Sequence, residues 1–106
     1  MAELTEQLFR VKADDALEQA RAALLPLADE ADFEVELQNG VMHIVFDDPA
    51  GKFVVSPNAP VRQIWVSAMA RSYKLSWSPE AGAFALDGEP LPALLQRLAV
   101  TFMRSA

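Results

Sequence analysis

The spacing of apolar residues changes twice along the chain, and no other feature limits the possible folds as much. Over residues 5–25, apolar side chains recur every three or four positions, which predicts a helix with one face on a core. From Phe33 to Asp87, apolar and polar residues mostly alternate, which predicts strands covered on one face. After Pro90 the helical spacing returns and continues to Phe102. The predicted order is therefore helix, strands, helix.

The segments between the predicted strands are of hairpin length, which requires an antiparallel sheet. Turn sequences such as QNG (38–40), DDPAG (47–51) and SPEAG (78–82) separate short alternating stretches. Each terminal helix has one apolar stripe to bury, so both are expected on the same face. The prediction is an α+β fold: a two-layer α–β sandwich with two terminal helices packed on one face of an antiparallel sheet of five to six strands. It forms a single domain over residues 1–106. Pro26 is expected to end or kink the first helix near Leu25.

Composition excludes several classes of function. The net charge is −6, and twelve of the fifteen acids lie in residues 1–48. Such a chain is a poor binder of nucleic acid and suits cations or a basic protein surface. No apolar run approaches the ~20 residues that span a bilayer, and the acidic start is unlike a secretory or transit signal. There is no cysteine for disulfides, thiolate catalysis or metal ligation. We expect a cytoplasmic protein with no nucleic-acid or membrane partner.

Few residues are available for catalysis. His43 is the single histidine, and the strand alternation places it on the outward face as an ordinary surface residue. The four glycines match no phosphate-binding loop. The chain is therefore not expected to be an enzyme.

Acidic residues are dense over the segment DEADFEVE, residues 29–36, which holds five carboxylates. Exposed carboxylates without partners attract cations, and sites made only of oxygen suit hard ions such as Ca²⁺, Mg²⁺, Mn²⁺ and iron. The alternating calcium-loop pattern with a central glycine is absent, so any metal site would be open and weak. The other interpretation is a solvated surface that keeps the protein soluble.

Trp65 is predicted on the outward face of its strand, beside Gln63 and Ser67, whereas Ile64 and Val66 point to the core. An exposed aromatic ringed by amides and basic residues has the composition of a protein–protein hot spot. The other interpretation is a Trp half-buried under the edge of a loop. The residues predicted to bind a partner are Ser56, Asn58, Arg62, Gln63, Trp65, Arg71 and Lys74.

Several stretches, in this order, resemble the frataxin family in its short bacterial form. NGVMHIVF (39–46) is similar to a glycine-containing turn and apolar strand of the family, and PVRQIWVS (60–67) to its signature strand. Tyr73-Lys74-Leu75 follows at the bacterial spacing, and DGEPLPALL (87–95) is similar to the turn and Leu-Leu start of the last helix. The likeness covers nearly the whole chain. Where the family has Gly-Gly or Ser-Gly after the signature strand, this chain has AMARS (68–72).

The resemblance implies a function as well as a fold. It implies weak binding of iron (Fe²⁺ or Fe³⁺), with other divalent cations possible, by acids of the first helix and first strand. It implies contact with a cysteine desulfurase and an iron–sulfur scaffold protein through a sheet surface centred on Trp65 and Gln63. The acids to which iron binding carries over are Asp14, Asp15, Glu18, Asp29, Glu30, Asp32, Glu34 and Glu36.

These points lead to one functional hypothesis and one alternative. The resemblance also implies a weak iron-oxidising activity, but no histidine–carboxylate cluster is evident that could build its site. The hypothesis is a non-catalytic, iron-binding regulator or iron donor in iron–sulfur cluster assembly, monomeric and able to oligomerise with excess iron. The alternative is a small acidic chaperone that holds an unfolded partner on the open sheet, which predicts an apolar groove and dimerisation. The polar neighbours of Trp65 favour a specific contact. Whether the effect on cluster assembly is activating or inhibiting stays open.

Overall fold

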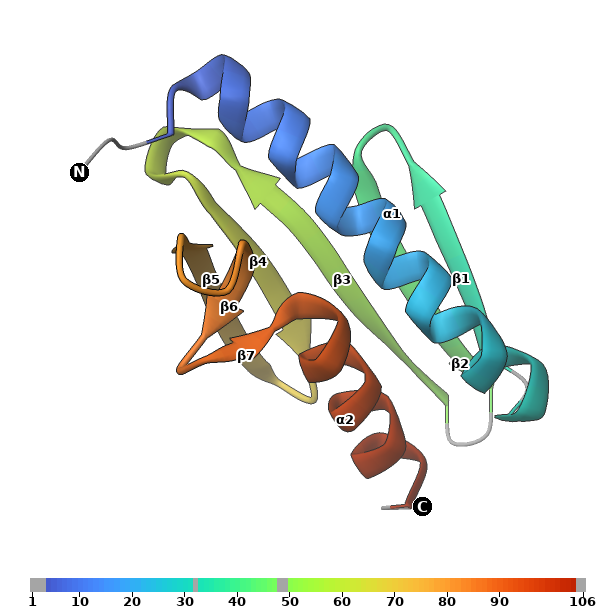
Figure 1. Ribbon diagram of the computed structural model, residues 1–106. Helices are drawn as coiled ribbons and strands as arrows, with labels where there is room; N and C mark the ends of the chain where they lie inside the picture. The colour runs from blue at the N-terminus through green and yellow to red at the C-terminus, as the bar shows by residue number, and fades with distance from the viewer. Residues whose placement is uncertain (1–3, 32, 48–49, 105–106) are drawn as a thin grey trace.

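Two helices pack on one face of a single antiparallel sheet, as the apolar spacing predicted (Figure 1). The structure, a computed structural model, describes residues 4–31, 33–47 and 50–104. The sheet runs in sequence order from β1 to β7, and every neighbouring pair is antiparallel. The elements are α1 Glu6–Ala31, β1 Phe33–Gln38, β2 Val41–Asp47, β3 Ala50–Asn58, the 3-10 turn η1 Ala59–Val61, β4 Gln63–Ala68, β5 Arg71–Ser78, β6 Ala83–Leu86, β7 Glu89–Pro90 and α2 Leu91–Arg104.

The strand count differs from the prediction, because the sheet has seven strands and not five to six. The additional strand, β7, is two residues long and pairs Leu86 with Glu89. It forms across a turn in which Asp87 and Gly88 have φ of 51° and 83°. Two residues are too few to leave an alternating pattern, and Pro90 was assigned to the helix start because its missing N–H is tolerated there.

The sequence predicted an end or a kink near Leu25; helix α1 does not end there but continues through Pro26 to Ala31. Proline has no N–H to give to the carbonyl four residues earlier, that of Ala22, which lies on the exposed side of the helix. The next carbonyl, of Ala23, accepts a hydrogen bond of 2.9 Å from Nε2 of Gln96 on α2. Beyond the proline, Leu27 packs against the core. Contacts with the rest of the fold therefore stabilise a turn that the local sequence disfavours.

The core lies between the helices and the sheet. Aromatic rings join the layers: Phe84 of β6 packs edge-on against Phe9 of α1 and against Trp77 of β5. At the other end of the sheet, Phe46 of β2 contacts Phe102 of α2 with ring centroids 4.7 Å apart. The centre of the sheet is fully covered, as the alternation predicted. Its buried residues are Met42, Ile44, Phe46, Phe53, Val55, Ile64, Val66, Leu75 and Phe84.

The tight hairpin between β4 and β5 contains no glycine. Met69 and Ala70 have φ of 52° and 63°, and Ala68 pairs directly with Arg71. Two consecutive residues with positive φ form the turn type that normally takes Asn-Gly or Gly-Gly, as the β1–β2 hairpin does with Asn39 and Gly40. A side chain with a Cβ in this region of φ/ψ space costs about 1–2 kcal/mol. The β4–β5 turn therefore holds strain that a glycine would relieve.

Ala70→Gly is accordingly expected to raise the free energy of unfolding by about 0.5–1 kcal/mol, the relief of strain being partly offset by a more flexible unfolded chain. Urea unfolding followed by circular dichroism measures this change. The matched control is Ala22→Gly at an exposed position inside α1, which should lower stability by a similar amount. Equal destabilisation by both variants would contradict strain in the turn.

Candidate functional site

Trp65 lies on the sheet face that the helices leave open. Its neighbours in β4, Ile64 and Val66, are buried under the helices, and strand geometry therefore turns Trp65 the other way. Its indole Nε1 donates a hydrogen bond of 2.9 Å to Oε1 of Gln63. The ammonium of Lys74, directly opposite on β5, lies 4.8 Å from the ring centroid. The ring is half-buried, and these two contacts restrain its orientation.

Polar residues of three adjacent strands surround the ring. Ser56 of β3 pairs with Trp65. Two residues along the strands, on the same face, Gln63 pairs with Asn58 of β3 on one side and with Ser76 of β5 on the other. Gln63 Nε2 donates to Ser76 Oγ at 3.2 Å, so Gln63 bridges Trp65 and Ser76. We call this set the Trp65 surface; its members are Ser56, Asn58, Gln63, Trp65, Lys74 and Ser76. Ser76 was not among the predicted site residues, although its alternation with Leu75 placed it outward.

Two of the predicted partner-binding residues lie elsewhere. Arg62 turns back toward the start of α1, where its Nε donates to the carbonyl of Leu4 at 3.1 Å and its Nη1 donates to the carbonyl of Ala59. Arg71 pairs with Ala68, which is buried on the helix side of the sheet. Opposite residues in a ladder share a face, so Arg71 belongs to the side away from Trp65. Alternation within β5 gives the same side, because Arg71 shares a face with buried Leu75.

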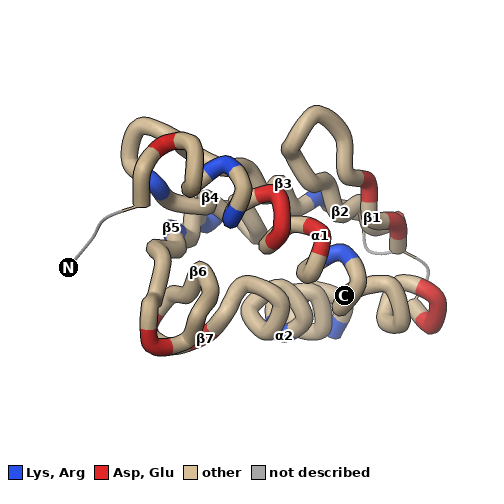
Figure 2. Tube along the Cα trace, turned by 45° about the horizontal axis from the view of Figure 1, so that its top comes forward, with Lys and Arg blue, Asp and Glu red and all other residues tan. Residues whose placement is uncertain are grey.

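The predicted metal-binding acids are exposed but do not converge. In the described ranges, no group of three or more Asp, Glu and His side chains is placed to hold a metal ion. Strand alternation turns Glu34 and Glu36 of β1 to the open face, whereas α1 packs on the opposite face of the sheet. Figure 2 shows acidic positions along both α1 and β1. Glu18 is 3.7 Å from Arg21. Asp32 lies outside the described residues. The exposed predicted acids are Asp14, Asp15, Glu18, Asp29, Glu30, Glu34 and Glu36.

His43 lies on the open face between buried Met42 and Ile44, as the alternation predicted. It is directly opposite Glu36 in the β1–β2 ladder. The side chain is half-buried. One carboxylate and one imidazole form too small a set to retain a metal ion or to build a catalytic site.

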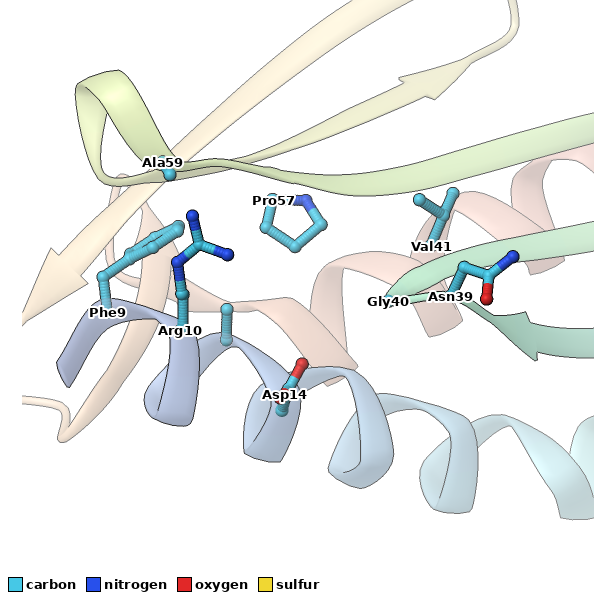
Figure 3. Close-up of a pocket in the computed structure, with 9 residues that line it drawn as sticks. Phe9, Arg10, Asp14, Asn39, Gly40, Val41, Pro57 and Ala59 are labelled. Atoms are coloured by element: carbon cyan, nitrogen blue, oxygen red, sulfur yellow. The ribbon is translucent and has the colours of Figure 1, made fainter. Parts of the chain in front are cut away.

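A cleft of about 460 Å³ opens between α1, the β1–β2 hairpin and the end of β3 (Figure 3). Arg10 and Asp14 of α1 point into it, facing Pro57 and the turn at Gly40 (Figure 3). The guanidinium of Arg10 also donates to Glu6 Oε2 at 2.8 Å, and this hydrogen bond lowers the pKa of the Glu6 carboxyl. Asp14 was among the predicted site residues, but the cleft was not predicted, because its walls come from three separate segments.

A family model described as a frataxin-like domain matches residues 2–103. The chain belongs to the frataxin family. The iron-sulfur cluster assembly protein CyaY of Janthinobacterium sp. (strain Marseille) is 31% identical over 97 residues, which cover 90% of this chain and 87% of that protein. The protein of the same name from Cupriavidus metallidurans is 37% identical over 75 residues, covering 69% of this chain and 67% of the relative.

A solved bacterial frataxin has the same fold as this frataxin-like chain. The frataxin of Psychromonas ingrahamii superimposes with a TM-score of 0.64 at 15% sequence identity, over 97% of this chain and 92% of that one. This match confirms the predicted fold class of two helices on an antiparallel sheet. In this frataxin-like chain, the Gln-Ile-Trp motif that indicated the family places Gln63 and Trp65 in hydrogen-bond contact on the open face. None of the described helices is long and apolar enough to cross a membrane.

Proposed function

We propose that this chain acts in the cytoplasm as a non-catalytic regulator or iron donor in iron–sulfur cluster assembly, through contact with a cysteine desulfurase and its scaffold protein. Membership of the frataxin family supports the process, since the relatives are named as iron-sulfur cluster assembly proteins. The observation that carries the proposal is the ordered position of the Trp65 ring on the open face of the sheet. A large aromatic side chain, held by Gln63 and Lys74 on a sheet face without helices, is an anchor already ordered for a partner.

The Trp65 surface suits a specific contact between folded proteins. Its aromatic centre is flanked by hydroxyl, amide and ammonium groups that can form a polar rim. The ring is half-buried before binding, so little side-chain entropy remains to be lost when a partner covers it. A holder of unfolded chains would instead need a broad apolar groove on this face, and Ser56, Asn58 and Ser76 interrupt any such groove.

Iron is proposed as cargo or effector, bound weakly by the exposed carboxylates of α1 and β1. Oxygen ligands suit Fe²⁺ and Fe³⁺ as well as other hard divalent cations. The described acids form no closed ligand set, so each ion would keep much of its water and exchange readily. The net charge of −6 raises the local concentration of cations around this surface. An ion held in this way can be transferred to a partner, and excess iron can bridge carboxylates of separate copies of an otherwise monomeric protein.

The proposed function is tested by recovering partners from the native cytosol. The purified chain, immobilised through its C-terminus, is expected to retain a cysteine desulfurase and a scaffold protein at stoichiometric ratios. Reconstituted cluster assembly with those two proteins then shows whether the chain changes the rate, and in which direction. Retention of many unrelated unfolded proteins in place of this complex would support the chaperone alternative. A desulfurase complex that neither binds the chain nor responds to it would contradict the proposal.

The β1 carboxylates provide a test of iron binding. Glu34→Gln combined with Glu36→Gln is expected to lower Fe²⁺ affinity several-fold in anaerobic calorimetric titration, because two adjacent oxygen ligands lose their charge. The matched control removes two exposed acids from the other end of the sheet, as Glu80→Gln with Asp87→Asn. Asparagine tolerates the positive φ of residue 87, so the control should fold normally. Identical isotherms for both double variants would place iron away from β1.

A further inference from the structure

The sheet has one long edge strand whose outer side is unpaired. β1 lies at one end of the strand order and has β2 as its neighbour, and in the described part of the chain no strand lies on its other side. Alternate residues of the six-residue strand therefore direct their backbone N–H and C=O groups away from the sheet. The opposite edge, β7, has two residues and leads directly into α2. Among the described strands, β1 alone offers a template for strand addition.

A cleft lies beside this edge, between β1 and α1. It has a volume of about 290 Å³ and is lined by Asp14, Leu17, Glu18, Leu37 and Gly40. Leu17 is fully buried and Leu37 is half-buried, so the floor is apolar, whereas both α1 carboxylates are exposed. A strand added next to β1 would direct alternate side chains to the helix side of the sheet, toward this floor. The cleft thus has room for apolar side chains from such a strand.

The open-face side of the same edge carries only acids at its central positions. Glu34 and Glu36 project there, one residue on either side of half-buried Val35. On an added strand, the residues opposite these two would share the open face with them, and opposite charges across a strand pair are stabilising. The complementary sequence is therefore alternating, with basic residues on the open face and aliphatic residues on the helix side.

A second copy of this chain does not fit the edge. Antiparallel pairing of two β1 strands with Glu34 opposite Glu36 would put four carboxylates on neighbouring strands, and like charges directly opposite are destabilising. The net charge of −6 adds long-range repulsion between copies. Electrostatic repulsion therefore disfavours self-association through β1, whereas a basic chain would be attracted to this edge.

We infer that β1 is a docking edge for an extended segment of a partner protein in which basic and aliphatic residues alternate, added to the sheet as a further antiparallel strand. This inference goes beyond the proposed function, because it assigns a second contact surface on a different element from Trp65 and requires neither iron nor a desulfurase. Backbone hydrogen bonds between the two strands would provide affinity, and the side chains on the two faces of β1 would provide selectivity.

The test uses a capped heptapeptide of alternating lysine and valine, added to the isotopically labelled protein without metal. NMR is expected to show shift changes and slowed amide exchange in β1 and around Leu37 and Gly40. The decisive control is the same peptide methylated at alternate backbone nitrogens, which keeps every side chain but blocks pairing along one edge. Its affinity should be lower by at least about tenfold. Equal affinity of the two peptides, or shifts centred on Trp65, would overturn the inference.

Two protein variants test the acidic selectivity. Glu34→Lys should weaken binding of the unmethylated peptide by at least about fivefold, whereas Glu80→Lys, with the same change in net charge, should alter it less than about twofold. Equal effects of the two variants would mean that the peptide is attracted by the net charge of the protein alone, and this would overturn the inference. The protein alone at high concentration should keep fast-exchanging amides on the outer side of β1. Slowed amides there without peptide would make a second copy the occupant and would also overturn it. No desulfurase enters these measurements, so their failure is separate from failure of the proposed function.

Discussion

Replacing Phe84 by alanine is expected to lower the free energy of unfolding by about 3–5 kcal/mol, a large part of the 5–15 kcal/mol typical of a domain. The ring is completely buried and makes edge-on contacts with two other rings. The distance between ring centroids is 5.6 Å to Phe9 of α1 and 5.3 Å to Trp77 of β5. Truncation would leave a cavity where the first helix meets the second half of the sheet. Urea unfolding followed by fluorescence and by circular dichroism measures the loss.

Phe84→Leu is the matched control, because it keeps most of the volume and should cost clearly less than the alanine variant. Both variants should unfold with the same dependence on urea concentration as the wild type if the denatured state is unchanged. A cost below about 1.5 kcal/mol for Phe84→Ala would mean that the surrounding rings collapse into the space, and that α1 is held on the sheet mainly by other contacts.

Trp65→Ala is expected to lower the affinity for the desulfurase–scaffold complex by at least about 30-fold, which corresponds to ~2 kcal/mol. The free energy of unfolding should change by no more than about 1 kcal/mol, because the ring lies on the open face and contacts Gln63 and Lys74 instead of the core. Calorimetric titration of the complex, paired with urea unfolding of the free variant, measures both quantities.

The second tryptophan provides the opposite case. Trp77 is half-buried as well, but it packs against the core through Phe84, and the ammonium of Lys12 lies 5.0 Å from its ring centroid. Trp77→Ala should therefore lower stability more than Trp65→Ala does, and the folded variant should keep its affinity for the complex. If Trp65→Ala destabilised the fold as much as Trp77→Ala and left binding intact, the open face would not be the contact surface.

Local patterns were sufficient for the layers of this fold. The change in apolar spacing near Phe33 and again after Pro90 located both helices and the sheet, because helices and strands repeat with different periods. Alternation within each strand predicted which residues are buried in the centre of the sheet, and it placed Trp65 and His43 on the other face. Asn39 and Gly40 were recognised as a hairpin turn because few other pairs adopt two positive φ values.

The exceptions are features that depend on contacts between distant segments. Helix α1 passes Pro26 because the residues beyond it pack on the core and Gln96 of α2 bonds to a nearby carbonyl. Met69 and Ala70 accept positive φ because the paired strands on both sides require a two-residue turn.

The composition of the surfaces was likewise decided by the tertiary structure. Strand register pairs Ser76 with Gln63 of the Trp65 surface, and a hydrogen bond to Leu4 holds Arg62 away from that surface. The acids are frequent in the sequence, but their distribution over two faces prevents the described ones from forming a closed metal site. Periodicity assigns a residue to a face of its own element, whereas the neighbours of that residue are set by register and by the packing of other elements.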